Sequence, residues 1–339
     1  MKDESGQIKK MVMLACVSIV FIFPFSTFQS ARAQDIHFSM FDLDPLLFNP
    51  AYSGFFDASA RFGAVYRNQW ASVSTPFQTV SATAEVALSR SRRNRNGING
   101  GLWVSNDRAG TLGYGSTTAS AIVSYFQGLG DGRNIVSVGL EGGIGQVGFS
   151  TDGMEMADGT ESFNRTKVFY PTLGAGVAWY CQVSNELYTK LGVSMRNINE
   201  PDISHTGMSA DTRLSRRFNI YGRAEWRFAD SWGLLPVVGY QRQRNFNELV
   251  YGGDVRWYLN EEPHSYLAFS AGIIGRHADA AAINLAVMWR EWTFAFCYDA
   301  NVSRLASASH TIGAFEVGIV YLMNKDNKRQ RKAIQCPIF

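Results

Sequence analysis

Apolar and polar residues alternate with a period of two along most of the chain from residue 58 onward. In one segment Phe218 and Trp226 fall on one face, while Arg223 and Glu225 fall on the other. Successive side chains of a β-strand point to opposite faces, so this alternation predicts strands with one apolar and one polar face. The pattern predicts about fourteen strands, over 58–70, 76–89, 97–107, 111–127, 133–146, 168–181, 185–197, 214–228, 232–243, 247–259, 263–275, 279–289, 290–300 and 311–323.

A soluble β-sandwich would show the same alternation, so other features must separate it from a membrane barrel. The predicted strands run to about ten residues, whereas strands of soluble proteins average about five or six. Charged residues make up 18% of the chain, against about 25% in an average soluble protein. Aromatic residues, which line both interfaces of membrane barrels, stand at the ends of many predicted strands: Trp70, Tyr125, Phe169, Trp179, Trp226, Trp232, Trp257, Trp289, Trp292 and Tyr321. The sequence therefore predicts an all-β fold, a transmembrane antiparallel β-barrel of the outer membrane over residues 58–323.

Residues 1–33 have the features of a signal peptide. Two lysines precede an apolar run over 11–25, and Ala31-Arg32-Ala33 forms a small-x-small cleavage site. A membrane-anchoring helix is the alternative, but the run is shorter than the roughly 20 apolar residues that span a bilayer. We therefore expect an exported protein.

The lengths of the connections predict how the barrel is oriented. Connections after even-numbered strands are mostly short, whereas several after odd-numbered strands are long, at about 147–167, 198–213 and 301–310. Outer-membrane barrels combine short periplasmic turns with longer outer loops. Both ends of the mature chain are therefore expected in the periplasm. They are an N-terminal lead over 34–57, which lies there or tucked against the barrel, and a basic tail over 324–339.

The polar faces of the predicted strands carry both signs of charge. The charges expected to point inward are Arg61, Arg67, Glu85, Glu141, Lys190, Arg196, Arg223, Glu225, Arg227, Asp254, Arg256, Arg290, Asp299 and Glu316. Opposite charges inside a barrel are expected to pair across the lumen and narrow it, although a wet polar channel would also have polar walls.

The sequence carries few catalytic or cofactor-binding motifs. Residues 143–148 match the spacing GxGxxG, but no helix or βαβ pattern accompanies them, so strand glycines are the better interpretation. GxSxG, HExxH and Walker motifs are absent from the sequence, and the five histidines are scattered. The sequence therefore predicts neither an enzyme nor a bound cofactor.

Two further features concern metals and thiols. Acidic residues of the longest predicted loop could bind Ca²⁺ through carboxylate oxygens, although a solvated acidic loop is the favoured interpretation: Asp152, Glu155, Asp158 and Glu161. Cys181 ends an even-numbered strand and Cys336 lies in the tail, so these two could form a periplasmic disulfide. Cys297 is expected to point into the barrel.

Two basic clusters are predicted to face the periplasm. They are solubilising charge at a membrane edge, or a docking surface for an acidic periplasmic partner or the anionic cell wall. The net charge of only +3 argues against a nucleic-acid partner. The clusters consist of Arg90, Arg92, Arg93 and Arg95, and of Lys325, Lys328, Arg329, Arg331 and Lys332.

One stretch near the N-terminus carries a family resemblance. It reads QDIHFS from residue 34, LFNPAYSG from 47, YRNQW from 66 and PF from 76. It resembles the start of the PorP/SprF family of type IX secretion proteins in Bacteroidota. The last four residues resemble the end of that family, except that Ile338 stands where a basic residue is usual. The matching positions are His37, Phe38, Asn49, Pro50, Ala51, Tyr52, Tyr66, Arg67, Asn68, Gln69, Trp70, Pro76 and Phe77.

The resemblance implies a non-enzymatic barrel in the outer membrane, whose matching residues serve partner recognition and barrel closure. It also implies association with the periplasmic ring of PorK/GldK and PorN/GldN and with linked lipoproteins, in support of secretion or surface anchoring of cargo such as gliding adhesins. Two rival functions remain open. A passive or substrate-specific porin would need an open lumen, and a lipid-modifying enzyme would need a catalytic constellation that the sequence does not reveal.

Overall fold

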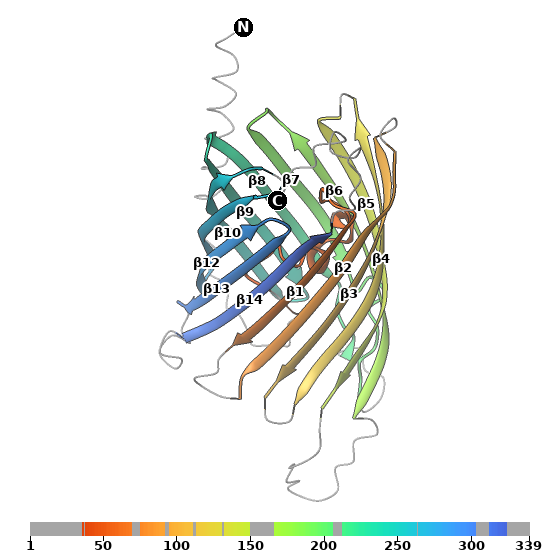
Figure 1. Cartoon of the computed structure of the whole chain (residues 1–339). Coiled ribbons are helices and arrows are strands. Elements are labelled where there is room, and N and C mark those ends of the chain that lie inside the picture. Colours follow the sequence, from red (N-terminus) through yellow and green to blue (C-terminus); the bar gives the residue numbers. More distant parts are fainter. Residues whose placement is uncertain are drawn as a thin grey trace, which may run out of the picture. The chain divides into compact units, whose positions relative to one another are not determined.

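The computed structural model describes residues 36, 38–69, 75–91, 95–110, 113–130, 132–149, 166–205, 212–262, 264–302 and 312–323. In these residues the chain forms a closed barrel of fourteen antiparallel strands, in which β1 closes onto β14 (Figure 1). The strands are β1 (Ala60–Gln69), β2 (Phe77–Ser91), β3 (Asn96–Ala109), β4 (Tyr114–Leu129), β5 (Asn134–Gly148), β6 (Lys167–Gln182), β7 (Leu187–Arg196), β8 (Arg217–Ala229), β9 (Trp232–Gln243), β10 (Phe246–Asn260), β11 (Leu267–Arg276), β12 (Ala280–Trp289), β13 (Trp292–Asn301) and β14 (Ile312–Met323).

The predicted fold class and the number of strands are confirmed. The prediction of 232–243 coincides with β9, whereas the strand predicted to start at 263 starts at Leu267. The backbone N–H of Ser265 donates to the carbonyl oxygen of Glu262 at 3.0 Å, so the chain turns there before it enters the sheet. The differences therefore concern bounds and not the existence of strands.

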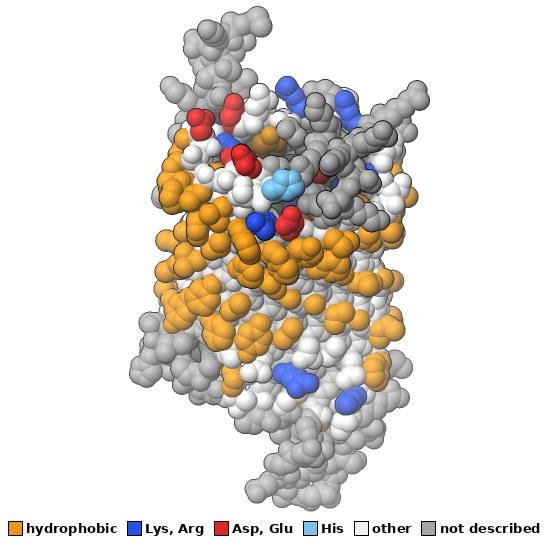
Figure 2. Space-filling view, in the orientation of Figure 1, with side chains coloured by type: hydrophobic (Ala, Val, Ile, Leu, Met, Phe, Trp, Pro, Cys, Tyr) orange, Lys and Arg blue, Asp and Glu red, His pale blue; other side chains and the backbone are white. Residues whose placement is uncertain are grey.

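Outward-pointing side chains are mostly apolar and form a belt around the barrel. Leu140 and Ile144 are each more than 60% exposed, and Figure 2 shows hydrophobic side chains in a broad band with charged residues above and below it. The indole rings of Trp232 and Trp257 stack with centroids 5.6 Å apart. An apolar band bordered by aromatic rings is the surface that a membrane barrel presents to lipid.

One predicted inward charge belongs to a turn. Trp289 pairs with Trp292, so Arg290 and Glu291 form a two-residue hairpin loop between β12 and β13. Arg290 has a φ of +52°, the left-handed conformation that tight hairpin turns favour. Its side chain is exposed, so the prediction that it points into the barrel is wrong.

Residues 38–56, which we call the lumen plug, lie inside the barrel (Figure 1). Leu46, Leu47 and Phe48 are at most 3% exposed, although they belong to none of the strands. The segment that was expected in the periplasm or tucked against the barrel is therefore inside its lumen. Its apolar side chains find there the buried surface that a peripheral position would lack.

Two short turns shape the plug. They are a helix, α2 (Pro45–Phe48), and a 3-10 helix, η1 (Pro50–Tyr52). The carboxylate of Asp44 accepts a hydrogen bond from the backbone N–H three residues on, at 3.3 Å. The side-chain oxygen of Asn49 accepts a hydrogen bond from the backbone N–H of Ala51 at 2.8 Å, at the start of η1. A capping side chain followed by proline is a favourable start for both turns.

Candidate functional site

The hydrophobic core of the molecule lies in the barrel lumen. Phe41, Phe48 and Tyr52 of the plug meet Tyr180 and Tyr221 of the wall, and all five side chains are at most 4% exposed. The ring centroids of Phe41 and Phe48 lie 4.8 Å apart, and those of Tyr52 and Tyr221 lie 5.9 Å apart. Packed aromatic rings bury large apolar areas, so this cluster attaches the plug firmly to the wall.

A buried network of arginines and carboxylates holds the beginning of the plug. Arg67 pairs with Glu316 and, at 2.9 Å, with Asp299, which also pairs with Arg276 at 2.9 Å. The backbone N–H of Ser39 donates to Glu316 at 2.8 Å, and its hydroxyl donates to Asp299 at 2.9 Å. Charges buried so deeply need partners. Plug and wall therefore complete one network.

A second network surrounds Asp42 of the plug. Its carboxylate pairs with Arg223 and with Lys190, the latter at 3.6 Å, and accepts a hydrogen bond from the Tyr221 hydroxyl at 3.1 Å. Arg223 pairs in turn with Asp254 at 3.0 Å. Burial alone would raise the pKa of the Asp42 carboxyl, but the charges of Arg223 and Lys190 outweigh burial and lower this pKa. Asp42 is therefore ionised in the lumen, and its ion pairs hold the plug to the wall.

Reversing the charge of Arg223 should strongly destabilise the barrel. Arg223→Glu would place a third carboxylate beside Asp42 and Asp254, and breaking a buried ion pair costs about 3–5 kcal/mol. We expect a lower midpoint in thermal unfolding followed by heat-modifiable gel mobility. Arg256→Glu is the comparison, because the nearest carboxylate to Arg256, that of Glu225, lies 3.6 Å away. It should cause a smaller loss, and equal losses in the two variants would contradict this assignment.

The ion pairs between wall residues join strands that lie close together in the barrel wall. Arg61 on β1 pairs with Glu85 on the adjacent β2 at 2.7 Å, and Arg196 on β7 pairs with Glu141 on β5. The expectation of pairs across the lumen is therefore wrong for these charges. Because the plug occupies the space between opposite walls, the wall charges pair with nearby strands or with the plug.

Glycines in the wall make room for the plug. A Cβ added at Gly139 would lie 2.4 Å from the backbone of Pro50 and Ala51. A Cβ at Gly176 would lie 2.0 Å from the Asn49 side-chain oxygen. Glycine inside a strand costs about 0.5–1 kcal/mol relative to alanine. The close approach of the plug is the physical reason for glycine at these two positions.

Five of the predicted site residues come together inside the barrel. Phe38, Asn49, Pro50 and Tyr52 are buried in the plug, and Arg67 is buried in the wall network. Their described contacts are with the barrel itself, and their part in binding a partner stays a prediction.

Other predicted residues lie near the rims and turns. The Asn68 side chain points away from the lumen and donates to the Tyr66 hydroxyl at 3.1 Å. Arg95 donates to the carbonyl oxygen of Gly130 at 2.8 Å. Arg227, predicted to point inward, lies with its guanidinium carbon 3.7 Å from the ring centroid of the buried Tyr258 and also pairs with Glu261, with its side chain 30% exposed.

Some predictions fall outside the described residues. Among the predicted partner-binding residues these are His37, Trp70, Arg92, Arg93, Lys328, Arg329 and Arg331, and the four acidic residues of the candidate Ca²⁺ loop join them. Cys336 also lies outside, so its disulfide with Cys181 stays a prediction. Cys297 is confirmed as pointing inward, because it is fully buried and its thiol donates to Asp299 at 3.4 Å.

Sequence reasoning missed several residues that hold the plug. Ser39, Asp42 and Asp44 lie in a segment without strand or helix periodicity, so no pattern assigns a direction to their side chains. Arg217 and Arg276 are buried at strand ends, where bounds predicted from sequence are least certain. Asp44 alone had a usable signal, since an acidic residue before proline is typical of a helix start.

Neither a metal centre nor a spanning helix is found in the described part of the chain. No group of three His, Cys, Asp or Glu side chains there could hold a metal ion. No helix there is long and apolar enough to cross a membrane.

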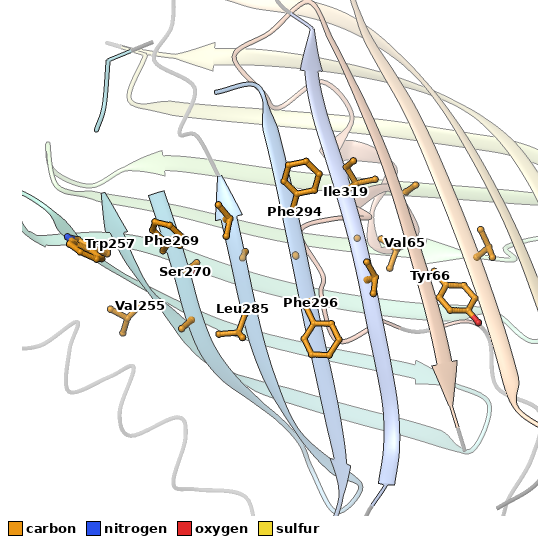
Figure 3. A pocket seen from close by; sticks show the side chains of 18 of the residues that line it. Val65, Tyr66, Val255, Trp257, Phe269, Ser270, Leu285, Phe294, Phe296 and Ile319 are labelled. Carbon is orange, nitrogen blue, oxygen red and sulfur yellow. The ribbon is translucent and has the colours of Figure 1, made fainter. Parts of the chain in front are cut away.

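A hollow of about 1160 Å³ lies on the wall around β10–β14 and β1 (Figure 3). Its lining is apolar and includes Phe294, Phe296 and Trp257, each more than 40% exposed on the outward face. These side chains face lipid, so the hollow belongs to the membrane-facing surface and is separate from the lumen.

Solved barrel proteins share the fold of this chain. The toluene transporter TodX of Pseudomonas putida superposes with a TM-score of 0.51 at 9% identity, covering 83% of this chain and 93% of that one. A deltaS2S3 mutant of TodX, described as a monoaromatic hydrocarbon channel, gives 0.50 at 7% identity over 83% and 94%. At such identities the likeness concerns the fold alone. No curated protein matches the sequence significantly.

The sequence itself matches one family profile, described as "Type IX secretion system membrane protein PorP/SprF", over residues 30–321. This range includes the plug and reaches into the last strand of the barrel. The resemblance seen at the N-terminus is therefore confirmed over most of the chain. This chain belongs to the PorP/SprF family of type IX secretion system membrane proteins.

Proposed function

We propose that this protein is a non-enzymatic barrel of the outer membrane that associates with the periplasmic ring of the secretion system. The ring consists of PorK/GldK and PorN/GldN, with linked lipoproteins. In this role the barrel supports secretion or surface anchoring of cargo such as gliding adhesins. The observation that carries the proposal is the plug, because a family member whose lumen holds its own chain is better suited to a scaffold than to a pore. A passive porin is disfavoured for the same reason.

The docking site is proposed at the end of the barrel that carries the short turns, and contacts at this end support the choice of residues. There Arg90, near the end of β2, donates to the carbonyl oxygens of Gly54 and Phe56, at 2.9 and 3.1 Å, so the strand end that leads into the turn between β2 and β3 contacts the end of the plug. Arg90 thus serves the barrel itself. We therefore assign docking to the other basic residues of this turn and to the basic tail.

Neutralising the docking residues should weaken association without unfolding the barrel. We expect a variant with Gln at Arg92, Arg93, Lys328, Arg329 and Arg331 to keep its heat-modifiable mobility, because Arg90 and the plug are untouched. Recovery of ring components after mild solubilisation should fall several-fold, and cargo export should fall with it. The salt dependence of the association should also weaken, since exposed charges are screened over about 8 Å at physiological salt.

The matched control changes exposed basic residues at the opposite end of the strands. Arg108 and Lys167 are exposed near the connections between β3 and β4 and between β5 and β6. Arg108→Gln with Lys167→Gln should leave ring recovery unchanged. If the docking variant also recovers ring and exports cargo normally, the basic residues are only solubilising charge.

A further inference from the structure

The barrel wall holds the plug largely through the main chain of the plug. Side chains from several strands donate to backbone carbonyl oxygens between Asp42 and Phe56, at distances between 2.8 and 3.2 Å: Arg61, Arg90, Arg196, Asn99 and Asn219. Two wall carboxylates, those of Glu316 and Glu85, accept hydrogen bonds from the backbone N–H groups of Ser39 and Gly54 in the plug. Every polypeptide carries these main-chain groups. Most of the wall's polar contacts could therefore be made by another extended segment.

Selectivity comes from two acidic positions and one aromatic position. Asp42 pairs with Arg223 and Lys190, and Asp44 accepts a hydrogen bond from the Trp103 indole at 3.0 Å. The plug contains no lysine or arginine between residues 38 and 56. The wall thus matches an acidic segment rather than a basic one.

An aromatic ring extends this match. The Lys190 ammonium lies 4.8 Å from the centroid of the Tyr52 ring, within the range of a cation–π interaction. The same ammonium pairs with Asp42, so acidic and aromatic recognition meet at one wall residue. Main-chain contacts combined with a few side-chain pockets are a common way to bind extended peptides.

We propose that the lumen is a binding site for an extended, acidic and aromatic-rich segment of a secreted partner, which takes the place of the plug. The partner's role as cargo rests on the proposed function, whereas the lumen's preference for such a segment rests on the wall. A plug tethered to β1 has a millimolar effective concentration. A separate segment therefore binds well only when the plug is weakened or when the segment's own protein is held at the barrel.

Phe48→Ala tests the proposal in the full-length barrel. It removes plug contacts to the rings of Phe41 and Tyr221, whose centroids lie 4.8 and 6.2 Å away, and leaves every wall residue unchanged. The probe is a fluorescent synthetic peptide with the sequence of residues 38–56, followed by anisotropy in detergent. We expect at least tenfold tighter binding than to the wild type. Phe296→Ala, the same change on the lipid-facing side, should bind like the wild type.

Two altered peptides test the chemistry of recognition. A peptide with Lys at the positions of Asp42 and Asp44 should bind Phe48→Ala at least tenfold more weakly. A peptide that keeps both acidic and all aromatic positions, with Ser elsewhere, should bind within tenfold of the parent sequence. Failure of this second peptide would mean that the lumen accepts only its own plug, which would overturn the proposal.

Folding of the variant barrels is checked by heat-modifiable mobility. Phe41→Ala weakens the plug at a second point, so the test does not depend on one variant. Absence of peptide binding to both folded variants, or equal binding of acidic and lysine peptides, would also overturn the proposal. The assay contains no secretion components. Its failure would leave ring association untouched, just as loss of ring association would leave peptide binding intact.

Discussion

Barrels carrying Gly139→Leu should conduct ions steadily in planar bilayers, whereas the wild-type barrel should stay nearly silent. A Cβ at this position would meet the backbone of Pro50 and Ala51 at 2.4 Å. Backbone atoms cannot rotate aside as the end of a side chain can, so the plug must shift as a unit. Overpacking of a buried site typically costs about 1–3 kcal/mol. Here the overpacking weakens the contact between β5 and the plug, and this contact helps to close the lumen.

Gly142→Leu provides the control in the same strand. Gly142 is exposed on the outward face of β5, and the nearest atom to an added Cβ is a Leu173 side-chain carbon at 3.9 Å. This variant should fold normally and conduct no more than the wild type. Large currents through the wild-type barrel would promote the porin hypothesis, and silent Gly139→Leu barrels would show that the plug does not control the lumen.

Arg67→Met should cause the largest loss of stability among single changes in the wall. Arg67 is 2% exposed and serves two carboxylates, Asp299 and Glu316, which are themselves at most 1% exposed. Removing one partner of a buried ion pair costs about 3–5 kcal/mol, because the other charge stays buried without compensation. We expect a much lower midpoint in thermal unfolding, measured by the loss of β-sheet circular dichroism.

Two comparisons separate this effect from loss of bulk. Arg216→Met removes an ion pair to Glu200 whose side chains are 55% and 36% exposed, and exposed pairs contribute only about 0–1 kcal/mol. Adding Glu316→Gln to Arg67→Met should recover part of the stability, since Asp299 keeps Arg276 at 2.9 Å. A double variant that is less stable than Arg67→Met would argue against an unpaired Glu316 as the cause.

The sequence identified many residues of the candidate site but did not show how they are arranged in space. Phe38, Asn49, Tyr52 and Arg67 were singled out through their resemblance to a family, and all four are buried in or around the plug. Alternation already assigned Arg67 to the inward face, but the location of the other three residues could not be predicted. A segment without periodicity carries no sign of which surface its side chains meet, whereas alternation assigns strand residues such as Glu316 to a face.

The strands, their number and their two faces follow from the sequence alone, because side-chain alternation is a local property of extended backbone. The position of residues 38–56 inside the lumen depends instead on contacts between distant parts of the chain. The bond from Ser39 to Glu316 spans 277 positions of sequence, and such contacts exist only after β1 has closed onto β14. The inward charges pair with nearby strands or with the plug, because the plug occupies the space in which they were expected to meet.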